Sequence, residues 1–476
     1  MTAISKMRTH AVCAAFAGLA LRMFFVLRFP SEAGDSPFYI ELAWNWLKKG
    51  VYGAAVNGQI VPLDSRVPGY PAFLAAVFSV AGESQRAVLF AQAAVDLATC
   101  FLIALIAARL APEASRRRVA IAGLWLAALC PFTANYSATI LTETLVIFLT
   151  ALAILLLMRA YVDDSQPAPS SLSPSKPALS LWFLGGIITG FGSLVRPETP
   201  LLLAAIGLAL ICKWWRREDW SKLVRAAVLM GAGFVLPLLP WAARNWRSLH
   251  EVQFLAPRYL QSGDDFVPRG FNAWMRTWVW RFGDVYLTDW RLNNAEIPIE
   301  SLPARAFDTP EEHARVAAIL DQYNETLTLT REQDAEFAAI AHERTSRHPL
   351  RTYFEIPALR TLALWFTPRG ELLPLDGHLW PIREEWQDDR PDLFVTLSLV
   401  LVNLVYIGLA LAGAWMARRQ PGWGLLVAFI AVRTVFIATC IETPEPRYVL
   451  ECFPAVLALG AQAFSAQGHL SSTGSG

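Results

Sequence analysis

Charge is scarce in this sequence. Only 17% of its 476 residues are Asp, Glu, Lys or Arg, and the formal net charge is +1. Because there is no basic domain or arm, we expect no nucleic-acid partner. The chain is instead 54% hydrophobic and contains 18 Trp. Its apolar runs approach or exceed the roughly 20 residues that cross a bilayer, which indicates an integral membrane protein.

Cysteine motifs and nucleotide-binding loops are also missing. The six cysteines form no CxxC pair and have no His at ligand spacing, which argues against a zinc site or a disulfide framework. Neither GxxxxGK[ST] nor GxGxxG occurs. The first apolar run shows no obvious signal-peptidase site, so we interpret it as a retained transmembrane helix.

Apolar runs and basic clusters together predict the threading. We expect about ten spans, at residues 11–29, 86–110, 119–135, 140–160, 179–195, 199–213, 221–242, 392–416, 421–441 and 446–465. If the N-terminus is cytoplasmic, all the basic clusters fall on the cytoplasmic side, as the positive-inside rule requires. These clusters are SKMRTH (5–10), RLAPEASRRR (109–118), MRAY (158–161) with Lys176, KWWRREDWSKLVR (213–225) and ARRQ (417–420).

The threading leaves two external pieces. The segment PAFLAAVFSVAG (71–82) is too short to span, so residues 30–85 form one external loop with an interfacial return. The second piece, 243–391, has no spanning run. The predicted domains are therefore an N-terminal transmembrane module (1–242) carrying loop 30–85, a mostly helical external region (243–391), and C-terminal transmembrane helices with a short tail (392–476).

Local signals predict helices within the second external piece. Thr309 opens a helix over 309–327, and Thr330 with Gln333 three residues later forms a capping box for a helix over 329–349. Residues 350–366 are amphipathic and are expected to lie on the membrane. The aromatic run 270–290 is interpreted as an interfacial belt, with stacking on a sugar or polyprenyl chain as the alternative. Residues 163–178 are interpreted as a flexible cytoplasmic linker.

Polar residues gather at the predicted external ends of the helices. Acids and arginines occur in six separate turns there, which is typical of a binding or catalytic face. Arg22 and Asp96, inside predicted spans, are expected to neutralise each other. The candidate catalytic residues are Asp35 and Glu143. The candidate substrate-binding residues are Tyr39, Arg66, Tyr70, Arg196, Glu198, Arg244, Asn245, Glu442, Arg447 and Tyr448.

A site at the external face favours a donor that is present in the membrane. A polyprenyl-phosphate sugar meets this condition, and it needs an acid to deprotonate the acceptor and arginines to hold the phosphate. Arg66 and Arg447 are the candidates for that phosphate. A phosphate leaves without a general acid, so the sugar would be inverted, and a monophosphate donor requires no metal or other cofactor. The alternative is a transporter or flippase of lipid-linked sugar.

Six strings in order carry a family resemblance. The sequence resembles the GT-C membrane glycosyltransferases of the dolichyl-phosphate-mannose protein mannosyltransferase and aminoarabinose-transferase type. The resemblance covers most of the chain except 246–340. The strings are GDSPFYIELAWNW (34–46), RVPGYPAFLA (66–75), ILTETLVIFL (140–149), GFGSLVRPETPLLL (190–203), LPWAARNW (239–246) and PEPRYVLECFP (444–454).

The resemblance implies an all-α polytopic fold and an inverting hexosyl- or pentosyltransferase. Asp35 then corresponds to the catalytic acid of the first external loop, and Glu143 to the acid of the second external turn. Many members have Asp-Glu in the first loop, whereas Asp35 here is followed by Ser36. The expected location is the bacterial inner membrane with a periplasmic site. The sugar stays open, and so does the acceptor, which could be a protein, a lipid or a glycan.

Overall fold

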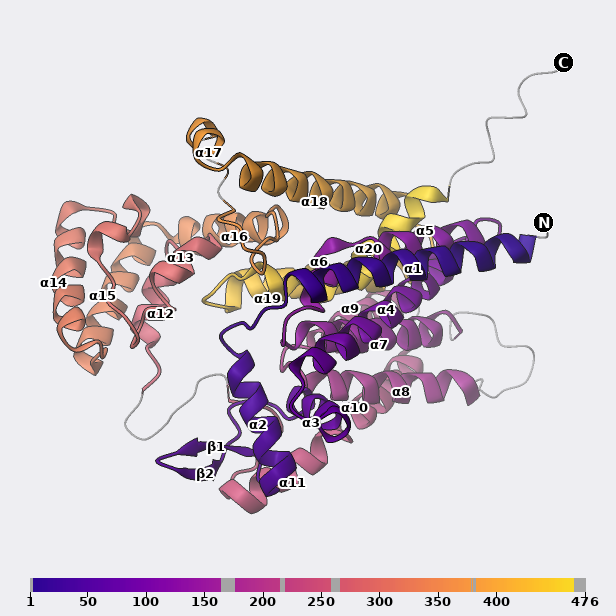
Figure 1. Ribbon diagram of the computed structural model, residues 1–476, viewed down its shortest axis with the longest axis horizontal. Coiled ribbons are helices and arrows are strands. Elements are labelled where there is room, and N and C mark those ends of the chain that lie inside the picture. Colours follow the sequence, from indigo (N-terminus) through magenta and orange to yellow (C-terminus); the bar gives the residue numbers. More distant parts are fainter. Residues whose placement is uncertain are drawn as a thin grey trace. The chain divides into compact units, whose positions relative to one another are not determined.

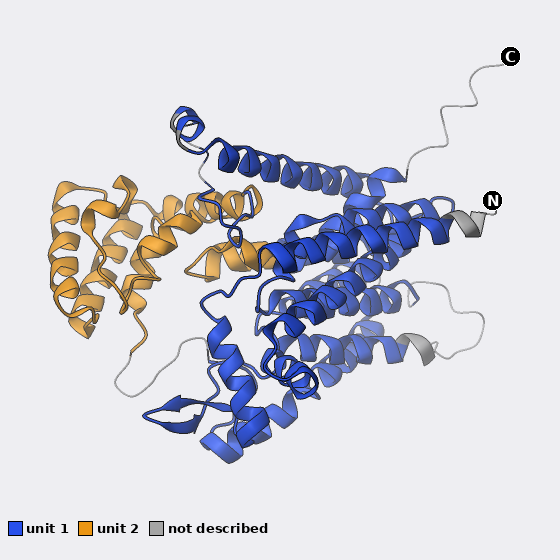
Figure 2. Cartoon of the chain, in the orientation of Figure 1, with its two compact units in different colours: residues 1–257, 368–432, 450–476 blue, residues 258–367, 433–449 orange. Residues whose placement is uncertain are grey.

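The computed structural model describes residues 3–163, 176–214, 219–257, 266–377, 379 and 382–465. The chain divides into two compact units (Figure 2). Unit 1 comprises residues 1–257, 368–432 and 450–476, and unit 2 comprises 258–367 and 433–449. The predicted domain boundaries at 242 and 391 separate membrane-spanning from external segments, and they stay predictions. Most of the predicted linker, residues 164–175, lies outside the described residues, as do 215–218 of one basic cluster.

Unit 1 is a helical bundle built around two long apolar helices (Figure 1). Helix α4 contacts α1, α5, α7 and α20, while α7 and α10 both pack on α8, and α18 packs on α20. Its helices are α1 (Ala3–Arg28), α2 (Ser36–Lys49), α3 (Gly69–Ala81), α4 (Gln85–Leu110), α5 (Arg116–Ala128), α6 (Pro131–Tyr136), α7 (Glu143–Asp163), α8 (Lys176–Ser193), α9 (Leu201–Trp214), α10 (Trp220–Val235), α11 (Leu238–Leu249), α17 (Ile382–Asp388), α18 (Arg390–Met416), the first part of α19 (Trp423–Cys440), α20 (Phe453–Ala461) and η6 (Gln462–Phe464).

The helices of unit 1 match the predicted spans in position, but not all are long enough to cross a membrane. Within the described residues, five helices are long and apolar enough, and a sixth span arises if α10 and α11, bent by 44° at their junction, count as one. The five are α1 from Met7, α4, α7, α18 and α19. The chain is a multi-pass membrane protein, while the predicted number of ten spans is not confirmed.

An ion pair between the first two long helices is confirmed. Arg22 Nη2 lies 2.7 Å from Asp96 Oδ2, and both side chains are buried. Arg22 also donates to the carbonyl oxygens of Gly18 and Ala128, which compensates part of the cost of burying its charge. The pair therefore joins α1 to α4.

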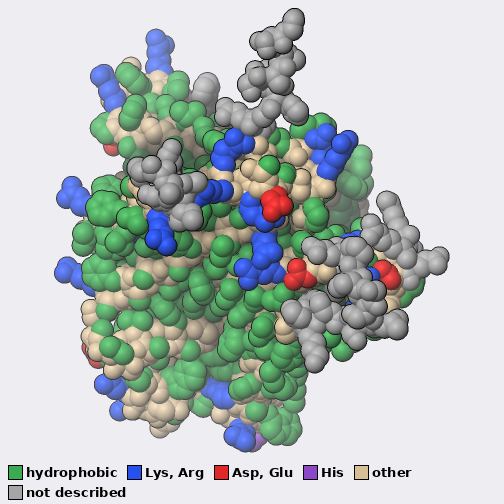
Figure 3. Space-filling model, turned by 90° about the vertical axis from the view of Figure 1, so that its right-hand side faces the viewer, with side chains coloured by type: hydrophobic (Ala, Val, Ile, Leu, Met, Phe, Trp, Pro, Cys, Tyr) green, Lys and Arg blue, Asp and Glu red, His purple; other side chains and the backbone are tan. Residues whose placement is uncertain are grey.

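One face of unit 1 gathers the basic helix ends. Helices α4 and α9 end with Arg109 and Lys213 in their last turns, and α5 begins at Arg116. Figure 3 shows that Lys and Arg outnumber Asp and Glu on this face. This distribution agrees with the charge rule that was used to orient the chain. Which side of the membrane this face occupies stays a prediction.

The first loop of unit 1 contains a helix, a hairpin and a second helix. Helix α2 ends at Lys49, because Gly50 adopts a left-handed φ of 70° as its C-cap. An antiparallel hairpin of β1 (Gly53–Val56) and β2 (Gln59–Pro62) comes next, and the sequence patterns did not predict it. Its turn is Asn57-Gly58, with positive φ at both residues, as a tight hairpin turn needs.

Unit 2 is a smaller helical body. It contains α12 (Arg269–Arg276), α13 (Phe282–Leu287), η2 (Ile299–Ser301), η3 (Ala304–Ala306), α14 (Pro310–Thr326), α15 (Arg331–Arg347), a π-helical turn η4 (Arg351–Glu355), α16 (Ile356–Trp365), the last part of α19 and the first part of η5 (Pro446–Cys452). The Thr309 cap of α14 is confirmed, and so is the capping box: Gln333 N donates to Thr330 Oγ1, and Thr330 N donates to Gln333 Oε1.

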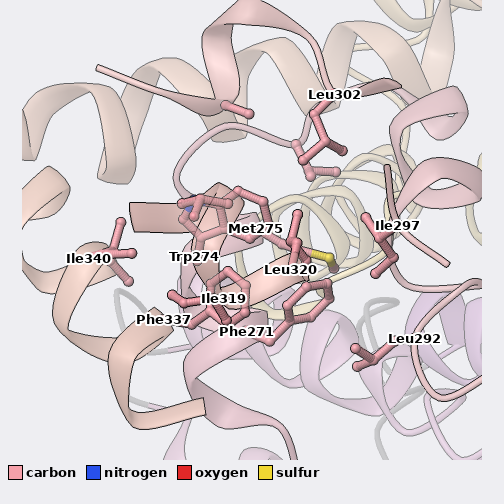
Figure 4. Close-up of a cluster of buried hydrophobic side chains, with 14 of the residues drawn as sticks. Phe271, Trp274, Met275, Leu292, Ile297, Leu302, Ile319, Leu320, Phe337 and Ile340 are labelled. Atoms are coloured by element: carbon pink, nitrogen blue, oxygen red, sulfur yellow. The ribbon is translucent and has the colours of Figure 1, made fainter. Parts of the chain in front are cut away.

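The structure corrects the interpretation of the aromatic run 270–290 as an interfacial belt, for the first half of that run. Phe271, Trp274 and Trp278 are fully buried and form the core of unit 2 with residues of α14 and α15, as Figure 4 shows for Phe271 and Trp274. Trp274 lies against Phe337, with ring centroids 5.0 Å apart. Trp274 lies in α12, and Trp278 lies two residues beyond the end of that helix at Arg276. Only Tyr286 and Trp290 of this run are largely exposed aromatic side chains.

Candidate active site

Asp35 stands at the start of α2 with its carboxylate available for contacts outside the helix. It is the N-cap residue, but its side chain caps no backbone N–H of α2. Its Oδ1 lies 2.9 Å from Nη2 of Arg66, and about a third of each side chain is exposed. Burial disfavours the charge of Arg66, but Asp35 and Tyr39 outweigh burial and raise its pKa. The structure therefore joins two predicted site residues 31 positions apart.

Ser36, the departure from the family pattern, fixes the loop that carries Asp35. Its buried hydroxyl accepts from the Ala33 N–H at 2.9 Å and donates to the Ile140 carbonyl at 2.8 Å. Ser31 adds a hydroxyl contact of 2.6 Å to Thr139. The loop before α2 is therefore tied to the turn that precedes Glu143.

Glu143 forms a second acid–arginine pair. Its Oε1 lies 2.9 Å from Nη1 of Arg196, in the turn after α8, and both side chains are largely buried. Arg196 Nε also lies 3.8 Å from Glu198 Oε2, and the Glu198 side chain is 36% exposed. Glu143 occupies the first turn of α7, where the helix dipole stabilises a carboxylate.

Tyr39 lies between these two pairs. Burial, together with the Asp35 carboxylate, raises the pKa of Tyr39 to about 12, while Arg66 and Arg196 act in the opposite direction. The phenol is therefore protonated at neutral pH. Its ring meets Tyr70 edge to face, with centroids 5.2 Å apart. The charges of both acid–arginine pairs therefore act on the Tyr39 phenol.

Gln92 supports this cluster from α4, and no sequence pattern had marked it. Its Oε1 accepts from the Tyr70 hydroxyl at 2.7 Å, while its Nε2 donates to the carbonyl oxygens of Ser137 and Thr139. A fully buried amide within the apolar helix α4 was the available signal, because polar groups in spanning helices require partners. Gln92 connects Tyr70 to the same turn that Ser36 holds.

An apolar cavity of about 610 Å³ adjoins the cluster within unit 1. Several lining residues are close in sequence to the polar ones: Pro68 follows Arg66, Leu145 follows Glu143, and Val195 precedes Arg196. Arg244 is the one charged residue among the lining side chains. The rest of the lining is mostly apolar and includes Trp46, Tyr52, Leu149, Phe191 and Trp241.

Arg244 and Asn245 hold the hairpin. The Arg244 guanidinium donates to the carbonyl oxygens of Tyr52 and Leu63, which flank the two strands, and its charge lies over the Tyr52 ring. Asn245 donates to the Gln253 carbonyl at 3.0 Å. These contacts are structural, and the predicted binding roles of the two residues stay predictions.

Glu442, Arg447 and Tyr448 belong to unit 2 and form a cluster of their own. Glu442 pairs with Arg276. Glu445 lies 2.6 Å from Arg447 and accepts from the Tyr448 hydroxyl at 2.8 Å. Burial, reinforced by Glu445 and Glu442, raises the pKa of Asp289 to about 6. Neither Arg276 nor Asp289 was predicted, because nothing in their local sequence marks them.

Comparison with known proteins confirms the GT-C resemblance. The family model described as dolichyl-phosphate-mannose-protein mannosyltransferase matches residues 65–241, which include Arg66, Glu143 and Arg196. No curated protein sequence matches the chain significantly.

Solved structures of an oligosaccharyltransferase from Archaeoglobus fulgidus share the fold. The complex of AglB with an inhibitory peptide and a dolichol-phosphate matches at a TM-score of 0.51 and 13% identity, covering 97% of this chain and 50% of that one. The form tethered to an acceptor peptide matches at a TM-score of 0.52 and 15% identity, with 96% and 49% coverage. The chain thus spans about half the length of these proteins.

Proposed function

We propose that this chain is an integral-membrane glycosyltransferase that uses a polyprenyl-phosphate sugar donor. The observation that carries the proposal is the convergence of Asp35–Arg66 and Glu143–Arg196 on Tyr39, beside an apolar cavity of about 610 Å³. Such a donor has an anionic head and an apolar chain. The site offers arginines for the head and an apolar cavity for the chain.

In this proposal Asp35 is the general base. Arg66 is bonded to Oδ1, so the second carboxylate oxygen has no protein partner among the described residues and can accept a proton. The acceptor oxygen or nitrogen attacks the anomeric carbon, the bond from that carbon to the phosphate oxygen breaks, and the acceptor proton passes to Asp35. The phosphate departs as an anion, and the anomeric configuration inverts.

Arg66 can contact both the general base Asp35 and the phosphate of the donor. It holds Asp35 through one nitrogen and is partly exposed, so it can meet a phosphate oxygen with its remaining donors. Glu143 is nearly fully buried against Arg196, which favours a positioning role for it rather than direct proton transfer. Its predicted catalytic role nevertheless stays a prediction.

The cavity suits the first isoprene units of the donor. Ring and branched side chains from α2, α7, α8 and α11 line it, and burying an isoprene unit against them releases water from apolar surface. The acceptor class favoured by the fold similarity is protein, because the solved relatives include one tethered to an acceptor peptide. The periplasmic face of a bacterial inner membrane remains the proposed location.

The test is sugar transfer in nanodiscs with a panel of radiolabelled polyprenyl-phosphate sugars and crude membrane acceptor. Asp35→Asn keeps the shape of the side chain and removes the base, so transfer should fall by about 100-fold or more. Glu32→Gln is the matched control, because Glu32 is an exposed acid three residues away, and it should retain wild-type transfer. Wild-type rates in a correctly inserted Asp35→Asn protein would refute the role of Asp35.

A further inference from the structure

We propose that unit 2 docks on the boundary between lipid headgroups and acyl chains through η4 and α16. The contact is a row of exposed apolar side chains, here called the outer stripe, formed by Leu350, Phe354, Ala358, Leu362 and Phe366. Its residues belong to unit 2, whereas the residues of the proposed active site belong to unit 1. Its partner is the membrane itself.

The outer stripe follows a strict spacing of four residues. Leu350, Phe354, Leu362 and Phe366 are 73%, 70%, 53% and 51% exposed. The opposite side of the same segment repeats the spacing with Ile356, Arg360 and Leu364, which are all buried. The segment therefore has a buried row, which includes the charged Arg360, and an exposed row that is entirely apolar.

The π-helical turn keeps the outer stripe straight. In an α-helix, residues four apart are rotated by about 40° relative to each other, so a row with this spacing gradually winds around the axis. The wider turn at Arg351–Glu355 holds more residues per turn, which rotates the row back. The local deviation from α geometry therefore reduces the angle by which Leu350 and Phe354 depart from the row that continues in α16.

Packing within unit 2 places α16, which carries the outer stripe, beside the end of α19. Leu364 is clustered with Ile437 and Val449, and Trp365 Nε1 donates to Thr434 Oγ1 at 3.1 Å. Thr434 and Ile437 lie in the last two turns of α19, one of the five helices able to cross a membrane. Helix α16 consequently lies at the end of a candidate span, which is the depth of the interfacial region.

Arg360 fixes the rotation of α16. Its guanidinium donates to the carbonyl oxygens of Val279 at 2.8 Å and Ile441 at 3.0 Å, just beyond the end of α19. Burial and the neighbouring Arg276 lower the pKa of Arg360 to about 10, so it is still charged at neutral pH. A cation at a helix C-terminus is favourable. Because Arg360 points inward, the outer stripe must point outward.

Lipid is the occupant that these observations favour. The outer stripe carries no charge, whereas Arg351 beside it is turned to Asp308 in unit 2. Tyr353, 65% exposed, flanks the stripe with the amphipathic ring that is typical of membrane interfaces. Val435 of α19 is also 60% exposed. An exposed apolar row at the end of a candidate span matches an interfacial helix.

The test places a photoreactive benzoylphenylalanine at Phe354 in the full chain, in nanodiscs of phosphatidylethanolamine and phosphatidylglycerol. A second protein carries it at Leu350. The matched control carries it at Glu336, an exposed position on α15 of the same unit. After irradiation, peptide mass spectrometry identifies what each probe has captured.

We expect the peptides with positions 354 and 350 to gain the mass of one phospholipid, and the peptide with position 336 to gain none. Capture of another protein, or of a second peptide of this chain, at both stripe positions would overturn the proposal. Absence of any adduct at both would also overturn it, because the stripe would then face water. None of these outcomes depends on glycosyl transfer.

Discussion

At the residue scale, Asp35 and Ser36 are adjacent residues with different roles. Asp35 presents a partly exposed carboxylate to Arg66, whereas Ser36 is completely buried and bonded to Ile140. The family resemblance marks position 36 as a site for a second acid. The structure shows instead that a small hydroxyl there closes the loop onto the turn before Glu143.

Ser36→Ala tests this positioning role. Removing the hydroxyl leaves the Ile140 carbonyl without this donor, so we expect a loss of about 1–3 kcal/mol in the free energy of unfolding. We also expect kcat to fall while KM for the donor changes little, because Asp35 loses its alignment. Pro37→Ala, at an exposed neighbouring position, is the control for both measurements. An unchanged kcat would show that Ser36 does not position Asp35.

Asp289 predicts a pH dependence in unit 2. Burial, with Glu445 and Glu442 nearby, raises its pKa from 3.8 to about 6. Between these values the folded state holds a proton that the unfolded state has released, so the stability contribution present below about pH 4 is lost as pH rises through 6. Asp289→Asn should flatten this decline in thermal unfolding of the whole chain. The exposed Asp321→Asn should retain it, and equal slopes in all three proteins would contradict the assignment.

At the scale of elements, the site depends on close approaches that only the fold reveals. Gly69 donates its N–H to Leu194 O at 2.6 Å, and an added Cβ would lie 2.5 Å from that oxygen. The start of α3 is thereby fixed against the end of α8. Tyr70 is the next residue, and its ring contacts Tyr39, so the position of α3 also affects Tyr39.

Gly69→Ala should displace α3 from α8. We expect a clear drop in the thermal midpoint and loss of transfer activity, because backbone must move to relieve the contact. Gly207→Ala is the control, since a Cβ there meets open space on α9 and alanine favours a helix. A Gly69→Ala protein with wild-type stability and activity would show that the approach is not required.

The cavity predicts a dependence on donor chain length. Leu149→Trp should fill part of it and raise KM for a long polyprenyl donor several-fold, with a much smaller effect on a donor shortened to one isoprene unit. The comparison of the two donors in the same variant separates chain binding from general misfolding. Equal effects on both donors would place the chain elsewhere.

At the scale of the whole molecule, apolar runs predicted the long helices well. Capping signals also worked, as Thr330 and Gln333 show. The hairpin was missed because its strands are four residues each and lack clear alternation, although Asn57-Gly58 was a usable turn signal. Trp274 and Trp278 were misinterpreted because composition alone does not distinguish buried aromatic side chains from an interfacial belt.

The sequence indicated which residues belong to the site, but not which of them pair with one another. Asp35 with Arg66 and Glu143 with Arg196 are separated by 31 and 53 positions, and only the packing of the helices brings each pair together. Glu442, Arg447 and Tyr448 were grouped with them by topology; they belong to unit 2, and the grouping stays a prediction. Gln92 was not predicted because its partners, Tyr70, Ser137 and Thr139, are distant in sequence and a single amide in an apolar run does not indicate them.

The reaction as a whole is predicted to proceed without a divalent metal. A monophosphate leaving group can be stabilised by arginine, which is why we expect EDTA to leave the transfer rate within about two-fold of its untreated value. The measurement uses purified protein in nanodiscs, with readdition of Mg²⁺ or Mn²⁺ as the control. A loss of activity that either metal restores would contradict this expectation.

The most direct test of the central claim is phosphorus NMR of the reaction mixture, with sugar transfer counted in parallel. The account predicts that one polyprenyl monophosphate is released for each sugar transferred, and that Asp35→Asn abolishes both signals together. Release of a diphosphate, or sugar transfer without release of the monophosphate, would contradict the proposed donor and the reaction assigned to this site.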